Sequence, residues 1–350
     1  MITKKMKLNS ENVVGIVLFV GLFLYPLFVS SYKVISLSYF LSMTFLSLSL
    51  VLVWGLCGVF SFGQAAFFGI GGYIYAIVAM NLENAVITPV ALLIGVLAGG
   101  LIAGILGYFM FYGGINDVFV GLITLCVTVV IETFMAQTAG SEWKIGSVLL
   151  GGYNGITGIP SISLGSFSFF DNRFYYLVLV LFTATYIGLR LLSVSRYGYT
   201  LIAIRENRDR TKLFGYNVPK IQTLIFALGG SLAALSGILY ATWGSYITPS
   251  AMGLTAATLP VVLVAAGGRK NLTAAVVFTL FYYWFSQILS ASGNEYALII
   301  LGVVLILVIL FVPDGIVVAL FNWLDKFLLE NKKLTATKRK KESLHESSNS

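Results

Sequence analysis

The sequence is poor in charged residues. They make up only 10% of its 350 residues, against about a quarter in an ordinary soluble domain. Hydrophobic residues make up 58%, and the mean hydropathy is +0.92. This composition excludes an ordinary soluble fold and is typical of a protein that crosses a membrane several times. Since no apolar run is followed by an A-x-A-like cleavage site, we expect the first run to be a retained helix and not a signal peptide.

Histidine and cysteine are also scarce. The only histidine, His345, lies in a Lys- and Ser-rich tail, which argues against His-based metal sites and Ser–His or Cys–His catalysis. Cys57 and Cys126 lie in apolar runs and are predicted to be free packing residues. A GxxxxGK[ST] phosphate-binding loop is missing, so this chain is not expected to hydrolyse nucleotides itself. We therefore predict no catalytic residue, no metal and no cofactor.

Long apolar runs fill most of the chain and predict an all-α fold of about ten transmembrane helices. Each crossing of a bilayer needs roughly 20 apolar residues. The predicted domains are an N-terminal segment (1–12), a membrane domain (13–320) and a basic tail (321–350). The ten predicted spans are Val13–Ser30, Val34–Trp54, Gly63–Met80, Pro89–Phe111, Val118–Ala136, Phe174–Leu192, Ile221–Trp243, Met252–Ala266, Leu272–Leu289 and Tyr296–Val312.

Basic residues predict the orientation of these spans, because they accumulate on the cytoplasmic side. If the N-terminus is cytoplasmic and ten spans alternate, all of the 22 Lys and Arg residues lie inside except Lys33, Lys144 and Arg173. Both termini are therefore predicted to be cytoplasmic. The net charge of +8 is then mainly a topology signal and gives no argument for a nucleic-acid partner. The tail Asn331–Ser350 is predicted to be disordered and to touch anionic membrane lipid.

A basic segment, residues 190–220, interrupts the apolar pattern with seven Lys and Arg residues. Such a segment cannot lie in hydrocarbon, so residues 193–220 are predicted to form a cytoplasmic loop. Its centre, from Arg205 to Phe214, lacks helix breakers and is followed by Gly215, a typical C-terminal stop. We predict one short surface helix that a soluble partner contacts.

Two apolar segments carry residues that weaken a helix. Gly55–Tyr73 contains six glycines together with Ser61 and Gln64, and Met252–Ala266 is short and contains Pro260. Irregular or interrupted backbone at membrane depth is tolerated where it is buried in protein or lines a wet cavity, and such segments indicate a substrate path. The alternative is close helix packing through small residues. Both interpretations remain open for each segment.

Two features near the predicted outer face also have two interpretations. The loop Gln137–Arg173 is rich in glycine and aromatic residues, and it either docks an extracytoplasmic partner or folds over the helix ends. Glu132 is the one acid clearly inside a span. An intramembrane carboxylate suggests a functional site, but here its position favours snorkelling or a hydrogen bond to a neighbouring helix.

Several motifs, in order from about Leu46 to Leu320, resemble those of branched-chain amino acid ABC permeases of the LivM type. The most extensive is the run from Ser61 to Gly71, SFGQAAFFGIG, which resembles the signature LSLGQAAFFGIGAY. The other segments that resemble the family are Gly151–Ile156, Arg196–Gly198, Ala203–Asn207, Leu213–Val218, Ile247–Ser250, Gly267–Arg269 and Val312–Ile316.

The resemblance implies an importer subunit in a bacterial-type plasma (inner) membrane. Such a permease works with a second homologous permease, two cytoplasmic ATPase subunits and an extracytoplasmic solute-binding protein. The residues that the resemblance and the glycine pattern place on the translocation path are Ser61, Gly63, Gln64, Phe67 and Gly71. The residues that the resemblance assigns to ATPase coupling are Arg205, Glu206, Asn207, Arg208 and Gly215.

The substrate and the transport class have alternatives. Gly268-Arg269 resembles the urea branch of the family as well, which makes urea or a short amide the second candidate, although the short loop Asn81–Thr88 argues against that branch. Thr211 departs from the Ala that coupling loops of ABC importers often have. An alternative from another class is a stand-alone channel or secondary carrier. It would need its own ion site or proton relay, for which the sequence offers only Glu132.

Overall fold

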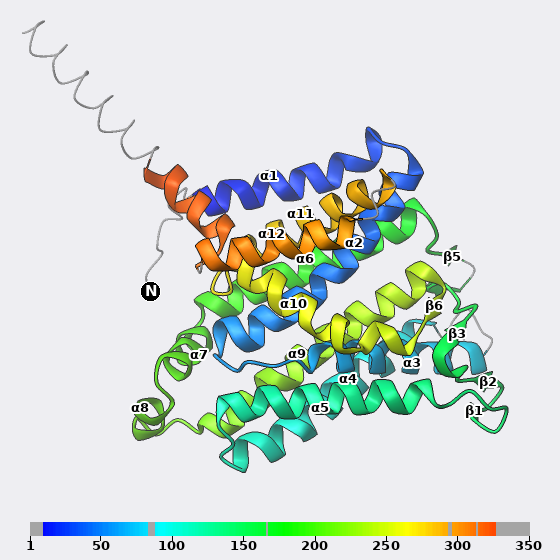
Figure 1. Cartoon of the computed structure of the whole chain (residues 1–350), viewed down its shortest axis with the longest axis horizontal. Coiled ribbons are helices and arrows are strands. Elements are labelled where there is room, and N and C mark those ends of the chain that lie inside the picture. The colour runs from blue at the N-terminus through cyan, green and yellow to red at the C-terminus, as the bar shows by residue number, and fades with distance from the viewer. Residues whose placement is uncertain (1–9, 83–87, 166, 293–295, 313, 327–350) are drawn as a thin grey trace, which may run out of the picture.

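The computed structural model describes residues 10–82, 88–165, 167–292, 296–312 and 314–326 (Figure 1). The predicted tail Asn331–Ser350 and most of the predicted N-terminal segment lie outside this range. The described chain is a bundle of long helices that run roughly side by side. The short helices α7 and α8 extend from one end of the bundle, and short β-strands lie at the other (Figure 1).

The long helices follow the predicted apolar runs to within a few residues for most spans. They are α1 (Ser10–Leu24), α2 (Ser31–Leu50), α3 (Gln64–Asn81), α4 (Thr88–Tyr112), α5 (Asp117–Ala136), α6 (Asn172–Val194), α9 (Val218–Gly244) and α11 (Leu272–Ala291). The shorter helical elements are the 3-10 turn η1 (Tyr25–Leu27), the π-helix η2 (Val51–Leu56), η3 (Gly152–Asn154), α7 (Arg196–Glu206), α8 (Arg208–Leu213), η4 (Pro249–Met252), α10 (Leu254–Gly267) and α12 (Ala297–Phe311). A last helical stretch covers residues 316–326.

In the described part of the chain, eight helical segments are long and apolar enough to cross a membrane. The all-α membrane fold predicted from the sequence is confirmed. The two remaining predicted spans coincide with the shorter helices α10 and α12. Since α10 has 14 residues, it is about 21 Å long and falls short of the ~30 Å hydrocarbon core. Full crossings by these two helices, and cytoplasmic termini, stay predictions.

The centre of the bundle is built on small residues. Helix α2 is the most deeply buried of the candidate spans, with 83% of its apolar window inside the protein. Helices α3, α4 and α9 touch almost backbone to backbone. A β-carbon at Gly71 would lie 2.5 Å from Ala234 Cα, and one at Gly237 would lie 1.9 Å from the Phe68 carbonyl oxygen. In a lipid bilayer the hydrophobic effect does not drive helices together, so they associate through close packing, which small residues permit.

The loop Gln137–Arg173 folds over the ends of helices α3 and α4 and pairs with the chain after α9. It forms two hairpins, β1 (Lys144–Ile145) with β2 (Val148–Leu149) and β4 (Ser163–Leu164) with β5 (Phe167–Ser168). Its strand β3 (Ile156–Thr157) pairs with β6 (Tyr246–Ile247). The Tyr75 hydroxyl donates to the Pro160 carbonyl at 3.0 Å. The loop therefore covers the helix ends, while docking of a partner stays a prediction.

Candidate functional site

The predicted irregular segment is a real break between α2 and α3, but it is shorter than Gly55–Tyr73. Helix α2 continues into the π-helix η2, and residues 57–63 are not helical. Gly58 has φ +81°, a conformation that glycine adopts at no steric cost. From Gln64 onward the glycine-rich stretch is a regular helix, because its glycines pack against neighbouring helices instead of interrupting α3.

Hydrogen bonds hold the break against helix α5. The Phe62 N–H donates to Thr124 Oγ1 at 3.1 Å, and the Gly63 N–H donates to Ser61 Oγ at 3.0 Å. Thr124 is completely buried. Two backbone groups that a helix would have satisfied internally thus find side-chain partners, as buried N–H groups require. Thr124 was not among the residues predicted from the sequence.

All five residues predicted for the translocation path are buried within this chain. Ser61 and Phe67 have no exposed surface, and Gly71 lies on Ala234. Gln64 is 2% exposed, and neither its amide oxygen nor its nitrogen has a hydrogen-bond partner among the described residues. A buried polar group without a partner costs about 1–3 kcal/mol. Gln64 is therefore held in an unfavourable environment at the first turn of α3.

The cytoplasmic-loop prediction of a single helix from Arg205 to Phe214 is wrong in one respect. Two helices, α7 and α8, meet at Asn207, whose backbone is extended (φ −161°, ψ 106°). The Asn207 side chain accepts a hydrogen bond from the Arg210 N–H at 2.9 Å and caps α8. A local asparagine cap thus outcompetes continuation of the helix. The predicted stop holds, since α8 ends at Leu213 and Gly215 has φ +85°.

Arg205 connects α7 directly to the break after α2. Its Nη1 donates to the Gly55 carbonyl oxygen at 2.6 Å. Gly58 lies against the same side chain, since a β-carbon there would be 2.9 Å from Arg205 Cα. Arg205 also pairs with Glu206 at 2.9 Å, and this guanidinium holds the pKa of the exposed Glu206 carboxyl below its usual value. Two of the predicted coupling residues, Arg205 and Glu206, thus form an ion pair, and Arg205 also binds the Gly55 carbonyl in the membrane domain.

Arg208 makes the corresponding connection for α8. It forms an ion pair with Asp117, the first residue of α5. The Gln222 amide oxygen, in the orientation that satisfies both partners, accepts from Arg208 Nη2 at 2.8 Å and Nε at 3.0 Å. Helix α8 is therefore fastened to α5 and α9. Asp117 was not predicted to have a special role. The only signal for it in the sequence was its negative charge at the same membrane face as Arg208.

The C-terminal tip of α8 has two exposed apolar side chains. Leu213 is 87% exposed and Phe214 is 82% exposed, next to the turn at Gly215. Large apolar side chains this exposed on a charged helix pair are typical of a surface that another protein covers. The helix pair α7–α8 is therefore held to the bundle by Arg205 and Arg208, while the tip of α8 is exposed.

Glu132 lies at the start of another helix. A β-carbon at Gly253, the N-cap of α10, would be 2.3 Å from Glu132 Oε1, so the carboxylate lies against this backbone. A negative charge is favourable at a helix N-terminus. This contact agrees with the expectation that Glu132 interacts with a neighbouring helix. Within the described residues, no group of three or more His, Cys, Asp and Glu residues could hold a metal.

These elements define a multi-pass membrane protein: a tightly packed helix bundle, a broken helix inside it and an exposed helix pair connected to the break. The chain belongs to the family of branched-chain amino acid transport system permease components, whose sequence model matches residues 33–309. The family consists of transport components of the plasma (inner) membrane, and its matched region contains the path and coupling residues predicted above.

Curated relatives agree with this assignment. The chain is 22% identical over 314 residues to the probable branched-chain amino acid transport permease LivM of Methanocaldococcus jannaschii, covering 77% of this chain and 89% of the relative. It is 23% identical over 297 residues to LivM of Escherichia coli, covering 77% and 66%. For BraD of Pseudomonas aeruginosa the values are 25% over 286 residues, 77% and 90%. No solved structure matches the chain.

Proposed function

We propose that this chain is a permease subunit of an ATP-binding cassette importer for branched-chain amino acids. The relatives just described are named as branched-chain amino acid transport permeases. The chain would share the path with a second homologous permease and receive substrate from an extracytoplasmic solute-binding protein. The contact of Arg205 with Gly55 is the observation that carries the proposal, because it links an exposed cytoplasmic helix to the broken helix in the membrane.

In this proposal the two cytoplasmic ATPase subunits supply the energy, and the helix pair α7–α8 transmits it. Leu213 and Phe214 would insert into an ATPase surface, a common mode of helix recognition. Asn207 and Gly215 set the shape of the pair, and Arg205 and Arg208 carry its movement to the break and to α5. Glu206 holds the Arg205 guanidinium in place.

We further propose that the segment Ser61–Gly71 borders the translocation path in a state other than the one described here. Its residues are buried in this state, as a closed path requires. The unpartnered amide of Gln64 supports the proposal, because opening toward a wet path would give both amide atoms hydrogen-bond partners. A polar group that is unsatisfied in one state biases the equilibrium toward the other.

A first test replaces Gln64 by leucine, which has a similar size. We expect the melting temperature of the purified protein to rise, because the substitution removes an unpaired amide that costs about 1–3 kcal/mol. Substrate uptake should fall at the same time. The matched control is Gln287→Leu, since the Gln287 amide donates to Ser36 Oγ at 2.8 Å and its loss should lower stability. Normal uptake by a stabilised Gln64→Leu protein would contradict the path assignment.

The proposed function as a whole is tested by uptake in proteoliposomes that contain the complete complex and its binding protein. Labelled leucine, valine, other amino acids and urea are compared with and without ATP. We expect ATP-dependent uptake of leucine or valine. Urea uptake would keep the architecture and move the substrate to the sister branch. Uptake that needs neither ATP nor the binding protein would overturn the importer and favour a stand-alone carrier.

A further inference from the structure

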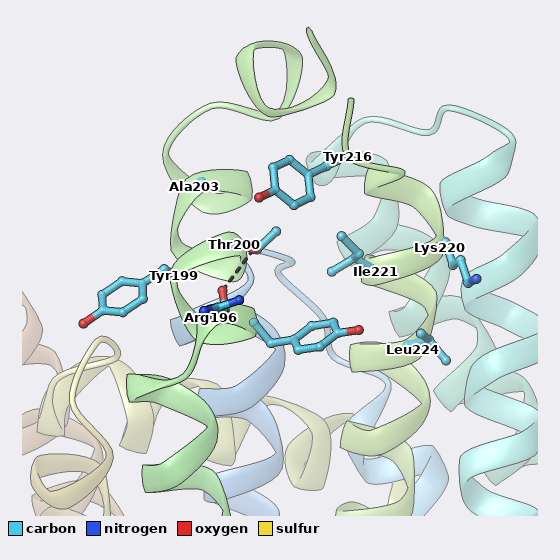
Figure 2. Close-up of a pocket in the computed structure, with 9 residues that line it drawn as sticks. Arg196, Tyr199, Thr200, Ala203, Tyr216, Lys220, Ile221 and Leu224 are labelled. Atoms are coloured by element: carbon cyan, nitrogen blue, oxygen red, sulfur yellow. Dashed lines mark hydrogen bonds between the residues drawn. The ribbon is translucent and has the colours of Figure 1, made fainter. Parts of the chain in front are cut away.

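A cavity of about 630 Å³ lies between α7 and the first turns of α9, at the same end of the bundle as α8 (Figure 2). Its volume falls within the range of about 300–1,000 Å³ that is usual for small-molecule sites. In Figure 2, Thr200 from α7 and Ile221 from α9 point into the space between the two helices, and the Tyr216 hydroxyl points across it. None of the residues assigned to coupling lines this cavity.

The charge around the cavity has one sign. Arg196 and Lys220 are part of its lining, and no Asp or Glu is. Both side chains are exposed, and neither has an ion pair or side-chain hydrogen bond with any residue that the structure describes. Three other arginines of the 190–220 segment are paired: Arg190 with Glu11, Arg205 with Glu206 and Arg208 with Asp117. The two unpaired cations at the cavity are thus available to an anionic ligand.

The position of the cavity indicates which kind of anionic ligand fits it. Helix α7 begins directly after the candidate span α6, and α9 is itself a candidate span whose first turns form the opposite wall. The cavity therefore lies where the chain leaves the apolar part of the bundle. Ile221 and Leu224 give its α9 wall an apolar surface on the side of the bundle, and Leu224 is 54% exposed. An occupant with a negative head and apolar tails matches this gradient.

We propose that this cavity binds the headgroup of an anionic phospholipid from the cytoplasmic leaflet. Arg196 and Lys220 contact the phosphate, the Tyr216 hydroxyl contacts a headgroup oxygen, and the acyl chains follow the exposed side of α9. The Thr200 hydroxyl stays on its own helix, where it donates to the Arg196 carbonyl at 3.1 Å. Tyrosine and basic residues are the usual anchors at a membrane interface. The site is separate from the exposed tip of α8, so the lipid and an ATPase subunit have different places on the helix pair.

The test uses the purified chain alone, so that its failure is distinct from failure of the transport proposal. Native mass spectrometry counts retained lipid during titration with phosphatidylglycerol or with phosphatidylcholine. We expect the wild-type chain to retain phosphatidylglycerol preferentially. In the double variant Arg196→Gln/Lys220→Gln, affinity should fall about 25-fold, since one basic residue near an anionic surface contributes about fivefold (~1 kcal/mol).

A matched double variant, Arg210→Gln/Lys326→Gln, removes the same charge from two exposed positions outside the cavity and should bind like the wild type. Equal loss in both double variants would overturn the proposal, because it would show only a general effect of charge. Equal binding of phosphatidylcholine would overturn it as well. Glycerol phosphate is the headgroup-only probe, and competition by it as strong as that of the lipid would overturn the assignment to a membrane lipid.

Discussion

Replacing both Arg205 and Arg208 by alanine is expected to lower ATP-driven uptake by about tenfold or more, the factor of a ~1.4 kcal/mol loss, while the protein remains inserted in the membrane. The first substitution removes the hydrogen bond to the Gly55 carbonyl, and the second removes the ion pair with Asp117 and the contact with Gln222. Hydrogen bonds to charged groups contribute about 1.5–3 kcal/mol each. Without these two sets of contacts, α7 and α8 keep their own N-terminal caps but are no longer held against the membrane domain.

The measurement is uptake and ATP hydrolysis by the same reconstituted complex. We expect hydrolysis to continue while uptake falls by about tenfold or more, the factor that corresponds to a loss of ~1.4 kcal/mol or greater in coupling. The matched control, Lys33→Ala/Lys326→Ala, removes two exposed positive charges that make no ion pair with a described residue, and it should transport normally. Unchanged uptake in the arginine double variant would remove the coupling assignment.

Gly237→Ala is expected to lower the melting temperature and the yield of folded protein. A β-carbon there would lie 1.9 Å from the carbonyl oxygen and 3.1 Å from the Cα of Phe68. These are backbone atoms of α3, so no side-chain rotation relieves the clash, and α3 and α9 must separate. Overpacking usually costs about 1–3 kcal/mol, and a backbone clash of this kind belongs at or above the upper end.

The control for Gly237→Ala is the same substitution at Gly188 in α6, where nothing lies within 4 Å of the new β-carbon. Thermal unfolding followed by size-exclusion chromatography compares the two proteins. Gly188→Ala should match or slightly exceed the wild type, because alanine favours a helix over glycine by about 1 kcal/mol. If the two substitutions gave the same melting temperature, the close contact between α3 and α9 would be wrong.

The bundle could be predicted because the bilayer fixes the length of each apolar run. Most candidate spans therefore begin and end within a few residues of the predicted limits. Short-range competition was harder to predict. Asn207 is an acceptable helix residue by composition, and only its capping of α8 shows that the helix must stop there. Similarly, glycines from Gly69 onward weaken an isolated helix but strengthen one that packs against α9 and its neighbours.

The candidate site was predicted as two separate segments, and its connections were not. Arg205 and Gly55 are 150 residues apart in the sequence, and Arg208 and Asp117 are 91 residues apart. No periodicity or local motif in one sequence specifies such pairs. Thr124, which holds the break after α2 through the Phe62 N–H, was missed for the same reason. A tertiary contact between distant residues becomes visible only when the fold brings them together.

The close-packed interfaces between α3, α4 and α9 also limit how this protein moves. Gly71 and Gly99 both meet Ala234, and Gly230 meets Ala103, so the three helices interlock at the level of their main chains. Such surfaces do not slide without losing contact along their whole length. We therefore expect α3, α4 and α9 to move as one rigid body, with any bending in the segments that connect this body to the rest of the bundle. We expect the π-helix η2 to act as the hinge, because its wider turn already departs from the α-helical hydrogen-bond pattern.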